Sequence, residues 1–149
     1  MEICDISAAD TLTLRNEVLR PNQPLSACKF AGDDDTQTRH LGAINHGEVV
    51  GVVSLYRNAH PQVAGRDPYQ IRGMATKPSF RGQGLGARLL QHAESYAMSA
   101  GGDIIWANAR HQALQFYIRQ GYKLASDEFV IDGIGPHFLI AKDLSFVRA

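Results

Sequence analysis

The sequence predicts a mixed α/β domain whose first half is antiparallel, and three observations support that class. Apolar runs typical of strands alternate with helical patterns along the chain. In the first half, successive strand candidates are separated by polar connections with only one early helix, which favours antiparallel pairing. The length of 149 residues fits a single domain. We therefore expect one domain over residues 1–149.

The first half of the chain is expected to form strands together with one short helix. The helix should follow Asp10, a type that caps helix N-termini, and end before Pro21, which cannot continue a helix. The segment 21–35 is expected to be an irregular or short-helical connection. Turn residues at Asn45–Glu48 predict a hairpin between two apolar runs. The expected strands are Met1–Ile6, Thr38–Asn45, Glu48–Tyr56 and Tyr69–Thr76.

The second half is expected to combine two helices with three strands. Apolar residues recur at steps of four over Gly84–Ala100, which predicts an amphipathic helix that ends at the glycines after it. A second helix is expected over His111–Gln120, followed by Gly121. The expected strands are Asp103–Ala107, Gly121–Ile131 and Pro136–Asp143, with a turn at Asp132-Gly133 between the last two.

Composition excludes several classes of function. Lys+Arg and Asp+Glu are both 15, so the chain has no basic excess for general nucleic-acid binding. No apolar stretch approaches the roughly 20 residues of a membrane-spanning helix, and the N-terminal residues lack the pattern of a signal peptide. Cys4 and Cys28 show no metal-site spacing. We expect a cytoplasmic protein with reduced thiols, no metal and neither nucleic-acid nor membrane partners.

The most informative segment is the glycine-rich loop Arg81–Arg88, which follows a predicted strand and opens a predicted helix. Glycines allow the backbone to approach a ligand closely, and the first N–H groups of a helix attract phosphate. A simple strand-to-helix turn is the alternative. The loop also fits Gly-x-Gly-x-x-Ala, but the next strand ends in Asn108-Ala-Arg110 without the acidic residue of a dinucleotide site. A nucleotide P-loop is excluded because no Gly-Lys-Ser/Thr follows.

Two segments together carry a resemblance to a known family. Arg81-Gly82-Gln83-Gly84-Leu85-Gly86 resembles the acetyl-CoA pyrophosphate loop of the GCN5-related N-acetyltransferases (GNAT), and Ala113–Tyr122 resembles their second signature, Ala-x-x-Phe-Tyr-x-x-x-Gly-Phe/Tyr. The order of elements matches over essentially the whole chain. The resemblance implies the GNAT acyl-CoA N-acyltransferase fold, a mixed and mostly antiparallel central sheet that is splayed in the middle and flanked by helices.

The resemblance also implies how acetyl-CoA, the co-substrate, would be held. Backbone N–H groups of the loop would bind the pyrophosphate, and the pantetheine arm would pair with the strand before the loop. Asn108 or Arg110 would supply a further contact, although this chain has Arg110 where many members have Asn; capping of the following helix is the alternative. The implied cofactor-binding residues are Met74, Ala75, Thr76, Arg81, Gly82, Gln83, Gly84, Leu85, Gly86, Ala87, Asn108, Arg110 and Phe116.

Three residues are candidates for catalysis. Tyr117 matches the family tyrosine that protonates the leaving thiolate, although a tyrosine there can also simply pack. The attacking amine must lose a proton, and the strand Tyr69–Thr76 has no carboxylate to accept it. His137 and Glu128 are the candidate bases, and each can equally be a structural residue. Phe116 is expected to pack and not to react.

The acceptor side of the site is open at this point. Arg15, Arg20 and Arg72 have the chemistry to bind a carboxylate on the acceptor. The run Asp33-Asp34-Asp35 has the opposite charge and would attract a cationic amine, unless it is a solvated turn. The acceptor is therefore expected only to be a small-molecule or peptide amine.

The main functional expectation is transfer of the acetyl group of acetyl-CoA to a primary amine by direct attack, without an acyl-cysteine. A non-catalytic acyl-CoA-binding module is the first alternative, and a dinucleotide-binding protein is the second. Dimers are frequent in similar proteins, so a homodimer is also considered.

Overall fold

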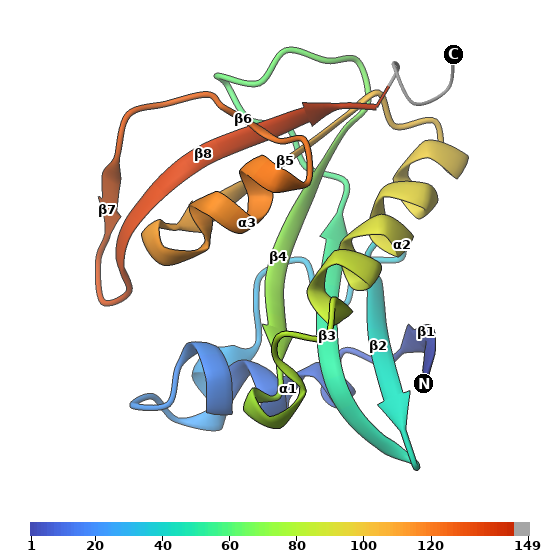
Figure 1. The fold of residues 1–149 in the computed structure, drawn as a ribbon. Helices are drawn as coiled ribbons and strands as arrows, with labels where there is room; N and C mark the ends of the chain where they lie inside the picture. The colour runs from blue at the N-terminus through green and yellow to red at the C-terminus, as the bar shows by residue number, and fades with distance from the viewer. Residues whose placement is uncertain (145–149) are drawn as a thin grey trace. The chain divides into compact units, whose positions relative to one another are not determined.

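The computed structural model describes residues 1–144 and divides into two compact units (Figure 1). Unit 1 comprises Met1–Tyr56 and Ile71–Tyr96, and unit 2 comprises Arg57–Gln70 and the chain from Ala97 onward. The strands follow the order β1-β2-β3-β4-β5-β8-β6, and β7 pairs with β8. Their bounds are β1 Glu2–Ile6, β2 Arg39–Asn45, β3 Glu48–Tyr56, β4 Pro68–Thr76, β5 Ile104–Arg110, β6 Lys123–Leu124, β7 Phe129–Ile131 and β8 Gly135–Asp143.

Within residues 1–144, three α-helices accompany the strands, together with shorter helical turns. They are α1 (Leu12–Leu14), α2 (Leu85–Ser99) and α3 (Leu114–Arg119). The 3-10 turns are Ala9–Thr11, Leu25–Cys28, Pro78–Phe80 and His111–Ala113, and a π-helical turn covers Arg15–Leu19.

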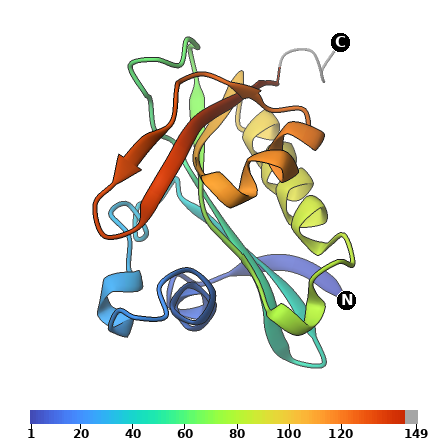
Figure 2. The ribbon, with the colours of Figure 1, turned by 60° about the vertical axis from the view of Figure 1, so that its left-hand side comes forward.

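Unit 1 contains the antiparallel part of the sheet that the sequence predicted. β1 pairs with β2 and β2 with β3, both antiparallel, and the β2–β3 ribbons run side by side (Figure 2). Their hairpin turns at His46 (φ 50°) and Gly47 (φ 79°), two successive left-handed residues whose twist matches that of paired strands. Leu14, Val52 and Ala75 form a buried cluster in this unit.

The predicted N-terminal helix exists as a composite of short turns. A 3-10 turn, α1 and a π-helical turn follow one another from Ala9 to Leu19. The helical run stops at Arg20 (φ −137°), one residue before Pro21, as expected from proline's missing N–H group. The connection after it holds the 3-10 turn Leu25–Cys28, which also agrees with the sequence.

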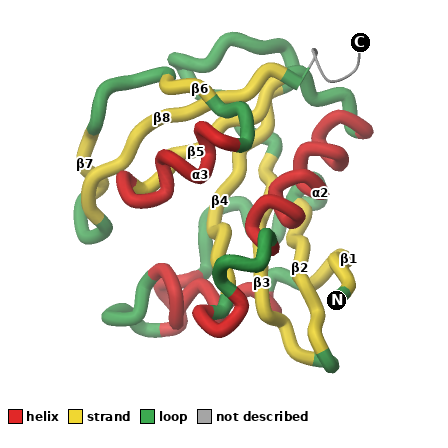
Figure 3. Tube along the Cα trace, viewed as in Figure 1, coloured by secondary structure: helices red, strands yellow, loops and turns green. Residues whose placement is uncertain are grey.

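Unit 2 is organised around a long antiparallel pair, β5 with β8. β8 lies between β5 and β6, and α3 lies against β5 (Figure 3). The first residues of β4 pair with β5 in parallel, and this ladder ends at Gln70↔Trp106. This parallel ladder comprises three residue pairs, from Pro68↔Ile104 to Gln70↔Trp106.

Two predicted strands differ from the observed ones by more than one residue. β5 does not end at Ala107 but continues to Arg110, because β8 supplies pairing partners along its whole length, up to Arg110↔His137. The expected strand Gly121–Ile131 is instead divided into β6 and β7. Between them the Leu139 carbonyl accepts a hydrogen bond from the Ala125 N–H at 2.8 Å, while the Leu139 N–H donates to the Ser126 hydroxyl at 3.0 Å, so a side chain takes over one of the two bonds.

Candidate functional site

The glycine loop of unit 1 has a conformation that needs glycine at two positions. Gly82 and Gly84 have φ of 79° and 76°, in the left-handed region that other residues enter at a cost. A Cβ atom placed on either would meet no atom within 4 Å. The loop therefore needs glycine for its backbone angles, and the space beside both residues is open to a ligand.

The same loop presents unpaired backbone donors at the start of α2. Arg88 N–H donates to the Gly84 carbonyl at 3.1 Å, which is the first hydrogen bond of the helix. Within residues 1–144, the N–H groups from Gly82 to Ala87 donate to no backbone carbonyl. With the helix dipole, these donors form a site for an anion. Arg81, Gly82, Gln83 and Gly84 are exposed at this point, whereas Leu85 of the predicted set is buried in the core.

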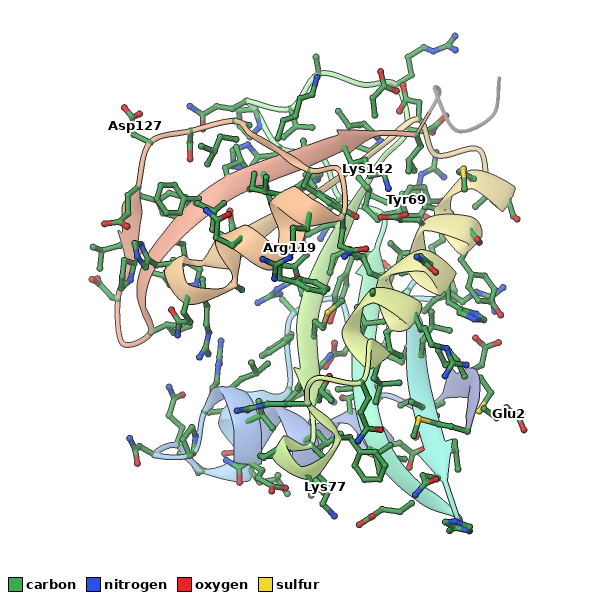
Figure 4. All side chains as sticks on the ribbon, viewed as in Figure 1. Glu2, Tyr69, Lys77, Arg119, Asp127 and Lys142 are labelled. Atoms are coloured by element: carbon green, nitrogen blue, oxygen red, sulfur yellow. The ribbon has the colours of Figure 1, made fainter. Side chains whose placement is uncertain are left out.

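The cations near this loop differ in their availability. Lys77, labelled in Figure 4, is bound to Glu48 at 2.8 Å, and this pairing raises its pKa. Arg81 and Arg88 are exposed and form no ion pair with any residue in the described range 1–144. These two arginines are therefore free to meet an anion at the loop.

The strand before the loop, β4, has two parts that differ in their pairing with β5. Its residues up to Gln70 pair with β5, and the ladder to β5 includes none of the residues after Gln70. Ala75 is buried in the unit 1 core, whereas Met74 and Thr76 are half-buried. Gly73 lies within the strand and has a left-handed φ of 65°. The predicted pantetheine-pairing residues therefore lie in the part of β4 that has left this ladder.

A buried charge network in unit 1 was not predicted. The Arg15 guanidinium is fully buried and holds both carboxylate oxygens of Asp33, at 2.6 and 3.1 Å. Asp33 also accepts hydrogen bonds from the Phe30 N–H at 2.9 Å and from the Tyr56 hydroxyl at 2.5 Å. Burial opposes ionisation of Asp33, but these donors outweigh it and lower the pKa of the carboxyl.

This network changes the interpretation of the acidic run and of Arg15. Asp33 is not part of a solvated turn or of an amine-attracting patch, because Arg15 neutralises it inside the protein. Asp34 is exposed and pairs with Lys29, and Asp35 accepts from the Gln37 N–H. Arg15 is likewise unavailable to an acceptor carboxylate, since Asp33 occupies it.

In unit 2, Tyr117 lies on α3 with its ring between two other aromatic rings. The centroids of Phe116 and Tyr122 are 5.1 and 5.4 Å from it. Its hydroxyl forms no hydrogen bond within the described residues. In residues 1–144, Arg15 Nε is the one side-chain nitrogen or oxygen atom that is both buried from solvent and without a hydrogen-bond partner. Since the Tyr117 hydroxyl also has no partner, it is accessible to solvent. Burial of the side chain raises the pKa of Tyr117 to about 12, so it is a neutral acid at physiological pH.

His137 lies at the start of β8 and is buried. Its Nδ1 is 2.8 Å from the Gly135 carbonyl, which can only accept, so Nδ1 carries a proton. In the neutral ring Nε2 then keeps a lone pair, and it has no hydrogen-bond partner among the described residues. The ring stacks on Phe129 at a centroid distance of 6.1 Å. This arrangement fixes the tautomer that a base at Nε2 requires.

The other predicted residues of unit 2 have different settings. Glu128 is exposed and bound to His111 Nδ1 at 2.6 Å. Asn108 is exposed within β5, and Arg110 lies at its end. Arg110 occupies the cap position of the next turn, but no side chain caps that turn by a hydrogen bond. Helix capping therefore does not explain these two residues.

Within residues 1–144, no group of three or more His, Cys, Asp or Glu side chains is placed to bind a metal ion. The described helices include none with the length and hydropathy needed to span a membrane.

Comparison with known proteins gives concordant matches. The model of the acetyltransferase (GNAT) family matches residues 4–122. YitI of Bacillus subtilis, described as an uncharacterized N-acetyltransferase, is 34% identical over 148 residues, or 99% of both chains. The aminoalkylphosphonate N-acetyltransferase of Salmonella typhimurium is 34% identical over 98 residues, covering 64% of this chain and 63% of its own.

Solved structures support the same fold. An aminoglycoside 6'-N-acetyltransferase complexed with coenzyme A covers 97% of both chains with a TM-score of 0.77 and 15% identity. ElaA of Escherichia coli gives the same TM-score at 18% identity. Because the family model spans most of the chain and a full-length relative shares a third of its residues, the chain belongs to the GNAT family of acetyltransferases and is an acyltransferase of that type.

Proposed function

We propose that this enzyme transfers the acetyl group of acetyl-CoA to the primary amine of a small molecule by direct attack. The observation that carries the proposal is the loop before α2, with two left-handed glycines, open space at both Cβ positions and unpaired N–H groups. A pyrophosphate fits such donors. The family match across both units supports one functional domain over residues 1–149.

The donor would be held by residues of unit 1. The N–H groups of Gly82–Ala87 would bind the pyrophosphate, with Arg81 and Arg88 adding positive charge. The backbone of Met74–Thr76, in the part of β4 beyond its ladder with β5, would pair with the pantetheine arm as an added strand. When bound, acetyl-CoA supplies the acetyl group as an activated thioester.

Two residues of unit 2 would move protons. Tyr117 Oη carries a proton at neutral pH and has no partner in the described chain, so it can donate to a departing sulfur. His137 Nε2 can accept a proton from the amine, directly or through water, because Nδ1 is already protonated. Glu128 is the weaker candidate base, since it is exposed and engaged by His111.

A small-molecule acceptor is supported by the named relatives. One is named for aminoalkylphosphonates, and a solved structure of the same fold is named for aminoglycosides. Both are amines of low molecular mass. The first is 34% identical over 98 residues and therefore carries more weight than the second, which shares 15%.

The test is a calorimetric titration of the protein with acetyl-CoA, CoA and NADH, followed by an amine screen for acetyl transfer. Gly84→Glu should abolish acetyl-CoA binding, because it strains the loop and places a carboxylate at the pyrophosphate site. Gly47→Glu is the matched control, since Gly47 has φ 79° and equally open space but lies in the β2–β3 turn. Failure of the wild type to bind acetyl-CoA would refute the proposal. Binding without turnover of any amine would favour a non-catalytic acyl-CoA-binding module.

A further inference from the structure

Three guanidinium groups of unit 1 surround one aromatic ring. The Cζ atoms of Arg15, Arg72 and Arg20 lie 4.0, 4.4 and 4.8 Å from the ring centroid of Phe30. Phe30 itself is buried. The ring face attracts each cation, but the cations repel one another, so the cluster needs negative charge nearby.

The protein supplies less negative charge to this cluster than it needs. Asp33 is the buried carboxylate at the cluster, and both of its oxygens are bound by Arg15. Three positive charges and one negative charge leave a balance of two positive charges, on Arg20 and Arg72. Neither forms an ion pair with a described residue.

Arg72 is half-buried on β4 and makes no hydrogen bond that would compensate its burial within residues 1–144. Its guanidinium lies over the rings of Phe30 and, at 5.7 Å, Tyr56. Burial, and then repulsion from Arg20 and Arg15, lower its pKa, while Tyr56 and Asp33 act in the opposite direction. An anion would relieve both unfavourable effects.

Arg20 is held in position by its own backbone and by one guanidinium hydrogen bond. Its carbonyl accepts from Asn16 Nδ2 at 3.0 Å and from the Gln23 N–H at 3.1 Å. One guanidinium nitrogen donates to the Ala27 carbonyl at 2.7 Å. The remaining donors of the fork have no partner in the described chain, which leaves Arg20 preorganised to bind an oxyanion.

We propose that Arg20 and Arg72 bind the anionic group of the acceptor, so that the substrates are short amines carrying a carboxylate or phosphonate. This inference rests on the proposed acetyl transfer. Arg72 lies two residues before Met74 on β4, where the donor arm is proposed to pair. Two residues of strand span about 6–7 Å. A linker of two or three carbons between the amine and the anion, together with the length of the arginine side chain, covers this distance.

The test compares amines that differ only in the group at their far end. The probes are 2-aminoethylphosphonate, β-alanine and propylamine, measured first by calorimetric binding in the presence of CoA and then by acetyl transfer. We expect one or both anionic amines to bind and be acetylated in preference to propylamine. Preference between phosphonate and carboxylate then identifies the anion.

Arg72→Gln and Arg20→Gln should each weaken binding of the preferred anionic amine by about 10- to 100-fold, the loss typical of a charged hydrogen bond. In both variants, kcat/KM for the anionic amine divided by kcat/KM for propylamine should fall by a similar factor. Arg39→Gln is the matched control, since Arg39 also lies over an aromatic ring, 4.6 Å from Tyr96, but is exposed and paired with Asp5.

The outcomes separate this inference from the proposed function. Acetyl-CoA binding with equal use of the three amines, or preference for propylamine, would overturn the anion site and leave the acetyltransferase intact. Binding of an anionic amine that Arg72→Gln does not weaken would also overturn it. Arginine-dependent binding of an anionic amine by a protein that fails to bind acetyl-CoA would support the anion site and refute the donor.

Discussion

Replacing Asp33 by asparagine should destabilise the protein strongly, because it leaves a buried arginine without its counter-ion. Arg15 and Asp33 have side chains with no exposed surface, and their closest atoms are 2.6 Å apart. Removing one partner of a buried ion pair typically costs about 3–5 kcal/mol. For a chain of this length, each kcal/mol lowers the melting temperature by about 2–4 °C. The expected fall in Tm is therefore roughly 6–20 °C.

The matched control is Asp34→Asn, the next residue along the chain. Asp34 pairs with Lys29, but their side chains are 69% and 61% exposed, so water replaces the lost contact and Tm should change little. Both variants are measured by thermal and urea unfolding at pH 7. Equal Tm values for the two variants would refute the reasoning, because they would show that burial of the Asp33 pair does not determine its contribution to stability.

The same pair predicts a pH dependence of definite sign. The folded-state pKa of Asp33 lies below its ordinary value of 3.8, so the unfolded chain binds a proton more readily than the folded one. The stability that the carboxylate contributes is present at neutral pH. This stability is lost as the pH falls below 3.8, the ordinary pKa of an aspartate, and then through the folded-state pKa of Asp33. Asp33→Asn should therefore flatten the acid limb of the stability curve. An acid limb as steep as that of the wild type would contradict this assignment.

The remaining predictions concern proton transfer in unit 2. Tyr117→Phe should lower kcat by about 100-fold or more without lowering Tm, because the hydroxyl makes no hydrogen bond within the described chain. Because the pKa of Tyr117 is raised to about 12, ionisation of this residue should not lower the wild-type rate up to roughly pH 10. Steady-state kinetics measured across pH test both points. His137→Gln should lower kcat more than Glu128→Gln does, and the reverse order in the same assay would make Glu128 the base.

Features coded by local sequence were predictable in this chain. The β2–β3 hairpin follows from its turn residues, and β3 was predicted with its observed bounds, Glu48–Tyr56, because a run of valines excludes most alternatives. The loop Arg81–Gly86 was predicted for the same reason, since its conformation depends on its own glycines. Fold class followed from the order of such segments, and family membership followed from two local motifs.

Features that depend on contacts between distant segments were not predictable. Arg15 and Asp33 are 18 positions apart, and an aspartate in a run of three resembles a solvated turn. One signal was present: Arg15 lies among the apolar residues of the N-terminal helix, between Leu14 and Val18, where a charge needs a buried partner. The end of β5 likewise depends on β8, which lies far along the chain, so its extension to Arg110 was missed.

Gly73 connects the parts of unit 1 that the proposals use. A Cβ atom at this position would lie 3.0 Å from Arg15 Nε and 3.1 Å from the Phe30 ring, at a φ of 65°. Only glycine combines that backbone angle with so close an approach. At Gly73 the strand lies against Arg15 and the Phe30 ring. Arg72 before it meets the same ring, and Met74 after it begins the proposed donor segment. One glycine thus lies beside the buried ion pair, the proposed anion-binding residue and the proposed donor segment, which is why the Asp33 and Arg72 variants need separate controls.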